Sequence, residues 1–306
     1  MISSFNEWDK LQRVVVGDAT KANWPVNDPV FNKEGEKTLW KDTPVPKGPV
    51  PEHIIDETNE DLATLATTLR QLGVEVERPA TYDFQRYDGL YNYCPRDRFL
   101  VYGSTIVDTP MMYPCRDQEY QSYMHILEDA KRIVSMPRKD GLVLDAANIL
   151  RLNDKWLFLE SDSGNRAAYN WLVEHFPEVS IELCNFYAGV HIDSTIVPLR
   201  DGLVLLNGSR VKPDMCPRVF DGWTKIYVND VVAQGFYEYP YASKWIAMNM
   251  LAISPDTVIV DRYQTDLIKS LEQCRFTVIP LELRHSRTLG GGFHCVTLDL
   301  VRSNNK

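Results

Sequence analysis

The chain has 306 residues and a formal net charge of −9, with 44% hydrophobic and 25% charged residues, which is the composition of an ordinary globular protein with a large core. The acidic balance argues against a nucleic-acid-binding protein, whose surface is basic. No apolar run approaches the roughly 18 residues that a membrane-spanning helix needs, and the N-terminal stretch lacks a signal-peptide pattern. We therefore expect a cytoplasmic protein with neither a nucleic-acid nor a membrane partner.

The first predicted elements are a strand over LQRVVVG, a long helix over EHIIDETNEDLATLATTLRQL that ends at Gly73, and a strand over VEVERP. Residues 20–51 differ from these, because six prolines fall between positions 25 and 51. This composition predicts a long surface excursion, and loops of this length often act as a lid or a binding surface.

Three β-hairpins are predicted next, since short alternating apolar runs flank turn residues. The hairpins cover residues 99–107, 144–160 with its turn at Asn153-Asp154, and 191–207 with its turn at Asp201-Gly202. Between them, 117–134 has helical spacing, GNRAAYNWLVEHF predicts a helix capped by Ser163, and IELC predicts a strand. The order hairpin, helix, strand thus recurs, which indicates a repeated module.

An aspartate begins each of the three hairpins: Asp97, Asp145 and Asp193. The first and second are 48 residues apart, and so are the second and third. Equal spacing predicts that the carboxylates meet near the axis of the repeat, although aspartates are also common at loop–strand junctions. Converging carboxylates repel one another and suit a cationic guest such as a guanidinium, which is planar and rich in N–H donors.

The C-terminal part predicts helices over SKWIAMNML and TDLIKSLEQC, separated by a strand over TVIVD and followed by one over FTVIPLEL. No boundary divides the chain, so we expect a single domain over 1–306. The stretch GGGFHCVTLDL, 290–300, predicts a strand that begins at Cys295 after a permissive glycine loop. Cys295 is then either a nucleophile on a tight loop or a buried core residue.

The six cysteines are scattered and form no C-x-x-C pair, which indicates neither a zinc site nor a disulfide framework. We therefore expect no metal and regard the other five cysteines as small buried side chains. His294 neighbours Cys295, but alternation along the expected strand points it to the opposite face, so we interpret it as structural.

Taken together, NEWDKLQRVVVG, CPRD, LDAANIL, HIDSTI, SKWIAMNM and GGGFHC, in this order, resemble the L-arginine amidinotransferases, the family of glycine amidinotransferase. The resemblance runs from about residue 5 to residue 302. It implies an α/β fold, a five-bladed pseudo-symmetric propeller of ββαβ modules called the pentein fold. It also implies that the C-terminal strand pairs with the LQRVVVG strand and closes the ring.

The resemblance further implies a set of site residues. Cys295 is the nucleophile that attacks the guanidinium carbon of arginine, His191 is the acid and then the base, and Asp145 orients His191. The substrate-binding residues implied are Asp97, Asp193, Arg210 and Ser243. The glycines before Cys295 let the backbone lie against the substrate. Arginine and an amine acceptor are then the small-molecule partners, no cofactor is needed, and a homodimer is possible.

Two rival functions remain open at this point: a guanidine-modifying hydrolase of the same superfamily, in which water attacks the intermediate, and a non-catalytic propeller. The acceptor amine is a separate question. Glycine amidinotransferase has Asn-Pro-Met before HID and paired serines before KW, whereas this chain has Ala188, Gly189 and Val190, then Ala242 and Ser243. These changes remove polar groups that recognise a small acceptor, so we expect an acceptor larger than glycine.

Overall fold

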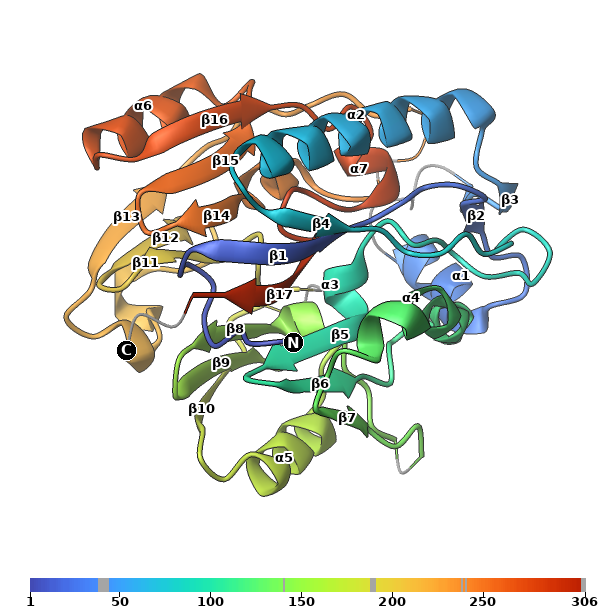
Figure 1. Ribbon diagram of the computed structural model, residues 1–306, viewed down its shortest axis with the longest axis horizontal. Coiled ribbons are helices and arrows are strands. Elements are labelled where there is room, and N and C mark those ends of the chain that lie inside the picture. Colours follow the sequence, from blue (N-terminus) through green and yellow to red (C-terminus); the bar gives the residue numbers. More distant parts are fainter. Residues whose placement is uncertain (38–43, 140, 188–190, 238, 240, 304–306) are drawn as a thin grey trace.

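Five three-stranded sheets form the frame of the protein, a five-bladed α/β propeller (Figure 1). The structure is a computed structural model, and it describes residues 1–37, 44–139, 141–187, 191–237, 239 and 241–303. In every sheet the first two strands pair antiparallel and the third pairs parallel to its neighbour. The expected pentein fold is confirmed.

Each of the five sheets contains three neighbouring strands. The sheets are β17 (Thr297–Arg302), β1 (Leu11–Val16) and β4 (Glu75–Glu77); β5 (Phe99–Tyr102), β6 (Thr105–Asp108) and β7 (Arg132–Ser135); β8 (Ile149–Leu152), β9 (Lys155–Leu159) and β10 (Ser180–Cys184); β11 (Ile196–Arg200), β12 (Leu203–Asn207) and β13 (Thr224–Val228); and β14 (Leu251–Ser254), β15 (Thr257–Asp261) and β16 (Thr277–Leu281). The three predicted hairpins are therefore confirmed.

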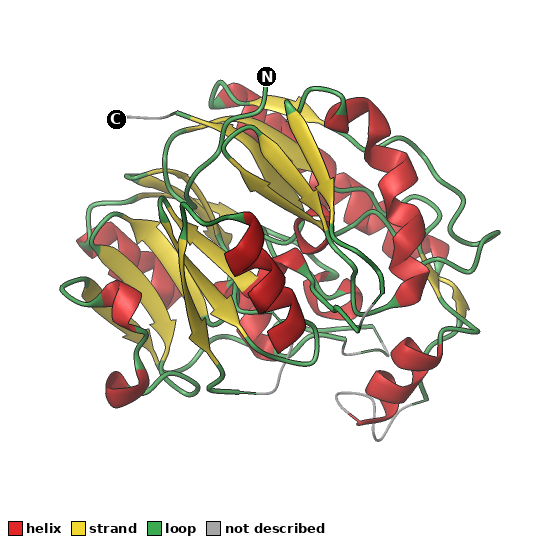
Figure 2. Cartoon of the chain, turned by 90° about the horizontal axis from the view of Figure 1, so that it is seen from below, coloured by secondary structure: helices red, strands yellow, loops and turns green. Residues whose placement is uncertain are grey.

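A helix connects the second and third strands in four of the described modules (Figure 2). These helices are α2 (Glu52–Gln71), α4 (Tyr120–Leu127), α5 (Arg166–His175) and α6 (Thr265–Gln273). In the remaining module two 3₁₀ turns, η3 (Pro213–Met215) and η4 (Arg218–Phe220), take the place of the helix. The repeat is therefore ββαβ in four modules and a shortened variant in one.

Apolar side chains at helical spacing fix each helix to its sheet. On α2, Leu62, Leu65 and Leu69 form one buried face and pack in the same cluster as Val14 and Val16 of β1. This spacing places them on one side of the helix. The other helices bury comparable faces, so the core consists of separate layers between the sheets and their helices.

The pairing of β1 with β17 closes the ring, as the resemblance implied. The two strands run antiparallel, with Leu11 opposite Arg302 and Val16 opposite Thr297. Elements from the two ends of the sequence therefore make one sheet, and β17 lies in the middle of the molecule (Figure 1).

Several boundaries differ from the sequence expectations. The helix predicted over SKWIAMNML is the 3₁₀ turn η5 (Lys244–Met248), because the backbone bends at Asn249 and enters β14. The 117–134 segment is 3₁₀ turn η1 (Pro114–Glu119), then α4 and β7. The cap of α5 is Asn165, whose side chain accepts from the Ala168 N–H, and not Ser163.

The proline-rich segment 20–51 is more integrated than a surface excursion. Its short elements are β2 (Asn23–Trp24), α1 (Pro29–Lys37) and β3 (Gly48–Pro49). Trp24, Phe31 and Val50 are buried in the main core cluster, and the Asp28 carboxylate accepts a hydrogen bond from the Cys115 backbone N–H at 2.8 Å. Burial of these side chains ties the described part of the segment to the body of the protein.

Buried ion pairs join the first residues of the chain to three modules. Arg151 of β8 donates to both carboxylate oxygens of Glu7, at 2.8 and 2.9 Å, and to Asp299 of β17 at 2.8 Å. Arg302 and Arg96 also pair with Asp299. Burial raises the pKa of Glu7, but the charge and hydrogen bonds of Arg151 and His294 outweigh it and hold that pKa well below its usual range. We call Glu7, Arg96, Arg151, Asp299 and Arg302 the central ion network.

We predict that Arg151→Met lowers the free energy of unfolding by about 3–5 kcal/mol, because it removes the guanidinium that binds both oxygens of buried Glu7 and one of the three that pair with buried Asp299. Urea denaturation followed by circular dichroism measures this. The control is Arg166→Met, which removes an equally bidentate but exposed pair with Glu160 and should leave the urea midpoint nearly unchanged. Equal losses in the two variants would contradict the prediction.

Candidate active site

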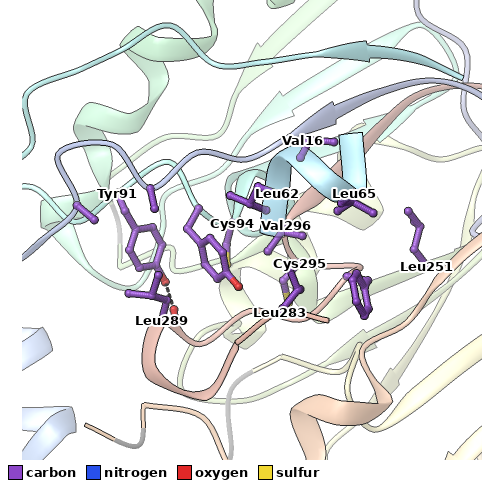
Figure 3. Packing of buried hydrophobic residues seen from close by; sticks show 14 of the residues in the cluster. Val16, Leu62, Leu65, Tyr91, Cys94, Leu251, Leu283, Leu289, Cys295 and Val296 are labelled. Atoms are coloured by element: carbon purple, nitrogen blue, oxygen red, sulfur yellow. Dashed lines mark hydrogen bonds between the residues drawn. The ribbon is translucent and has the colours of Figure 1, made fainter. Parts of the chain in front are cut away.

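Cys295 lies in a turn at the centre of the molecule, not at the first position of a strand. Residues 293–296 form the turn and β17 begins at Thr297, so the predicted strand start at Cys295 is wrong. The Cys295 N–H donates to the Asn249 side-chain oxygen at 2.9 Å and not to a neighbouring strand. The residue is buried among apolar neighbours that include Cys94, Leu283 and Val296 (Figure 3).

The three glycines before Cys295 make room for other parts of the protein. Gly290 has φ +80°, and a Cβ there would lie 2.1 Å from the Tyr241 ring. A Cβ on Gly291 would lie 2.5 Å from the Cys94 sulfur, and one on Gly292 would lie 2.7 Å from the Asn249 backbone oxygen. Glycine is therefore required here for close packing of the loop that presents Cys295.

His191 contacts two of the three equally spaced aspartates. Its Nε2 lies 2.9 Å from Asp145 Oδ2, and its Nδ1 lies 3.7 Å from Asp97 Oδ1. The other Asp145 oxygen accepts the Met112 N–H at 2.8 Å, so this carboxylate is held at both oxygens. His191 itself has φ +59°, a conformation that is uncommon outside glycine.

The third aspartate contacts the cysteine. Cys295 Sγ donates to Asp193 Oδ2 at 3.3 Å, and the same oxygen accepts from His294 Nδ1 at 2.8 Å. Asp97, Asp145 and Asp193, which precede β5, β8 and β11, thus meet around His191 and Cys295 in one buried cluster. We call these five residues the central cluster.

Two carboxylate oxygens in the central cluster have no hydrogen-bond partner among the described residues. They are Asp97 Oδ1 and Asp193 Oδ1, and both are buried. In each case the other oxygen is held by a second side chain: the Arg116 guanidinium at 2.7 Å for Asp97, and the His294 imidazole at 2.8 Å for Asp193. Unsatisfied buried acceptors are costly, so these two oxygens are candidate contacts for N–H donors of a ligand.

The two carboxylates differ in their electrostatic surroundings. Burial raises the pKa of Asp97, and the nearby His191 and Arg116 only partly oppose it. Burial also raises the pKa of Asp193, but the hydrogen bond and charge of His294, and then His191, outweigh it and lower that pKa. The Asn249 amide adds to this lowering, although its Nδ2 makes no hydrogen bond of normal geometry.

The histidine and the cysteine both favour their protonated forms in the unliganded protein. Burial lowers the pKa of His191, but the charge of Asp97 and the hydrogen bonds with Asp145 and Cys295 raise it well above the usual value. The hydrogen bond with Cys94, burial and the charge of Asp193 raise the pKa of the Cys295 thiol well above its usual value. The central cluster therefore combines a proton donor with a neutral thiol.

Arg210 and Ser243 are not joined to the central cluster by a direct contact among the described residues. Arg210 donates to the Thr195 hydroxyl at 2.8 Å and stacks on the Tyr187 ring, whose hydroxyl donates to the His191 backbone oxygen at 2.6 Å. Ser243 precedes η5 and makes no side-chain cap. Their substrate-binding roles stay predictions. Ala188, Gly189 and Val190 lie outside the described residues.

Four residues of the site did not follow from the sequence: Arg116, Tyr187, Asn249 and His294. His294 is the most informative, because the alternation argument placed it on the opposite face of a strand. The turn at 293–296 has no strand alternation, so His294 and Cys295 both reach Asp193. In the sequence, the FHC triplet was the feature that pointed to His294. Asn249 lies within the SKWIAMNM motif. Arg116 lies in none of the motifs given above.

Two kinds of feature are absent from the described part of the chain. No group of three or more His, Cys, Asp or Glu side chains there could hold a metal ion. No helix within the described ranges is long and apolar enough to span a membrane.

We predict that Asp193→Asn lowers the pKa of Cys295, because it removes a like charge beside the thiolate. Ultraviolet absorbance of the thiolate across a pH titration, with the Cys295→Ser signal subtracted, measures this pKa. Asp230→Asn, at a side chain that is 79% exposed, is the control and should leave the titration unchanged. An unshifted midpoint in Asp193→Asn would mean that this carboxylate does not act on the thiol.

No family model matches the chain, but individual proteins do over almost its whole length. It is 40% identical to an inosamine-phosphate amidinotransferase from Streptomyces glaucescens, over 100% of this chain and 98% of that protein. It is 28% identical to an L-arginine:L-lysine amidinotransferase from Pseudomonas savastanoi pv. phaseolicola, over 98% and 94% of the two chains.

Solved structures agree with these relatives. The inosamine-phosphate amidinotransferase of Streptomyces griseus superposes with a TM-score of 0.93 at 38% identity, covering 99% of this chain and 97% of that one. The N-terminal domain of a cyanobacterial arginine dihydrolase superposes with a TM-score of 0.67 at 14% identity, covering 96% and 98% of the two chains. At that identity the dihydrolase shares the fold alone.

Proposed function

Because the chain belongs to the amidinotransferase family, we propose that it transfers the amidino group of L-arginine to an amine of an inosamine phosphate. The family assignment confirms the resemblance seen in the sequence motifs. The donor is proposed from the relative named as acting on L-arginine. The hydrolase alternative is not favoured, because the hydrolase named above shares only the fold.

The observation that supports the reaction is the central cluster, which places a cysteine, a protonated histidine and two partly unpaired carboxylates together. In the proposed complex the arginine guanidinium donates its N–H groups to Asp97 Oδ1 and Asp193 Oδ1. A carboxylate and a guanidinium match in charge and in planar geometry. The positive charge of the guanidinium also offsets the carboxylate charge that raises the pKa of Cys295, and so favours the thiolate.

The first half-reaction forms a covalent intermediate. When the guanidinium binds, the Cys295 thiol releases its proton to solvent; Sγ of the resulting thiolate attacks the guanidinium carbon, and the bond between that carbon and the ornithine nitrogen breaks. His191 supplies the proton that ornithine needs to leave as an amine, since its raised pKa keeps it protonated. Asp145, held by the Met112 N–H, keeps the imidazole in place.

The second half-reaction reverses these roles. The acceptor amine attacks the amidino carbon, His191 takes the proton from the incoming nitrogen, and the carbon–sulfur bond breaks to restore Cys295. Covalent catalysis divides one difficult transfer into two easier steps. The enzyme then alternates between a free and an amidino form and follows ping-pong kinetics.

An inosamine phosphate is proposed as the acceptor because of the relatives at about 40% identity. Two Streptomyces proteins named for that acceptor are 40% and 39% identical to the chain, compared with 28% for the arginine:lysine enzyme. Ala242, where glycine amidinotransferase has a serine, agrees with an acceptor larger than glycine. Homodimer formation and a cytoplasmic location stay predictions.

The mechanism predicts a covalent adduct at Cys295 when arginine is the only substrate. Intact-protein mass spectrometry should show the amidino adduct in the wild type, together with one ornithine released per site. Cys295→Ala should form neither, because it lacks the nucleophile, while Cys274→Ala, at the half-buried cysteine that follows the last residue of α6, should behave as the wild type. Normal turnover by Cys295→Ala would refute the covalent route.

The acceptor is predicted from competition between amines with arginine saturating. An inosamine phosphate should give a kcat/KM at least about tenfold above those of L-lysine and glycine, equivalent to ~1.4 kcal/mol of transition-state preference. The unphosphorylated inosamine is the matched control for the phosphate group. A preference for glycine or lysine would overturn the acceptor assignment but leave the covalent mechanism intact.

A further inference from the structure

The two oxygens of Asp193 have different surroundings. Oδ2 accepts from His294 Nδ1 at 2.8 Å and from Cys295 Sγ at 3.3 Å. Oδ1 is buried and has no partner among the described residues. A carboxylate anchored through one oxygen has little freedom to rotate, so the anchoring group decides where the other oxygen points.

His294 is itself held on both sides. Its Nε2 lies 3.2 Å from Glu7 Oε2, its backbone N–H donates to the Asn249 backbone oxygen at 3.3 Å, and its backbone oxygen accepts from Arg96 Nε at 3.0 Å. An ionised carboxylate can only accept hydrogen bonds, so both ring nitrogens must donate when both acids are ionised. The ring then carries a positive charge between Glu7 and Asp193.

The contact partners of Glu7 make this arrangement rigid. Glu7 receives three hydrogen bonds from Arg151, two from the guanidinium and one from the backbone N–H, and Arg96 lies 3.5 Å from its Oε2. The charged groups around the imidazole of His294 are thus Glu7 and Asp193, with Arg96 and Arg151 behind Glu7. A continuous series of contacts therefore joins the central ion network to His294, His294 to Asp193, and Asp193 to the Cys295 thiol.

We propose that His294 is a positioning residue: it holds Asp193 Oδ2 beside Cys295 and thereby directs Asp193 Oδ1 toward the guanidinium of the amidino donor. This inference rests on the proposed function. Without the Nδ1 contact, the buried carboxylate loses the N–H donor that fixes its orientation. A rotated Asp193 no longer directs Oδ1 toward the donor guanidinium, so donor recognition should suffer.

Two amide variants separate the contacts of the two ring nitrogens. In His294→Asn the side-chain amide overlies Nδ1 and keeps a donor to Asp193, whereas in His294→Gln it overlies Nε2 and keeps a donor to Glu7 instead. The measured quantity is the arginine concentration that gives half the maximal rate of ornithine release in a single turnover without acceptor. We expect His294→Gln to raise it at least about tenfold, as for a lost hydrogen bond between charged groups, and His294→Asn to stay within about threefold of the wild type.

If His294 had only a structural role, the two variants would give a different result. Both variants lose the imidazolium, so both should lower the thermal unfolding midpoint, and a structural role would leave the arginine dependence alike in the two. The control is His285→Asn, at another buried histidine paired with a carboxylate, Glu57, at 2.6 Å. This control should lower the unfolding midpoint without changing the arginine dependence.

Either variant alone decides the outcome if the other does not fold. An unchanged arginine dependence in His294→Gln, or a tenfold rise in His294→Asn, would overturn the positioning role. Failure of the proposed function gives a separate result, because the wild type would then release no ornithine from arginine and form no adduct at Cys295.

Discussion

The central ion network is the interaction on which the rest of the structure depends. Glu7, near the start of the chain, lies between Arg151 of β8 and His294 of the cysteine loop. Asp299 of β17 forms ion pairs with Arg96, Arg151 and Arg302. Charges at this depth are costly unless their pairing is complete. Because the partners come from several modules, complete pairing is reached only when those modules are correctly placed around the axis.

In the central cluster, by contrast, the buried carboxylates are not completely paired. Three carboxylates face one histidine and one thiol, and two of their oxygens lack partners in the described structure. The carboxylate charges raise the pKa of His191, and for Cys295 they add to the hydrogen bond with Cys94 and to burial, which raise the pKa of the thiol. A cationic substrate completes the set, so substrate binding and activation of the nucleophile are coupled by electrostatics.

The features that the sequence predicted well are those carried by local pattern. The hairpin at Asp201-Gly202 and the apolar face of α2 follow from turn chemistry and helical spacing, and the equal spacing of Asp97, Asp145 and Asp193 led correctly to one cluster. The features that it missed depend on distant partners. His294 contacts Asp193 across 101 residues and Glu7 across 287, and no local pattern encodes such pairs. Arg116 resembles any arginine in a polar turn until its burial beside Asp97 and Glu119 is known.

The pairing of β1 with β17 has a consequence for how the enzyme is made. Arg302, the antiparallel partner of Leu11, is added to the growing chain 291 residues later. The entropic penalty of closing so long a loop grows only slowly with its length. On the ribosome, four of the five blades can be synthesised before the cysteine loop emerges. The nucleophile therefore arrives in the segment that closes the ring, and a chain that stops before this segment has neither the closed ring nor the Cys295 thiol at its centre.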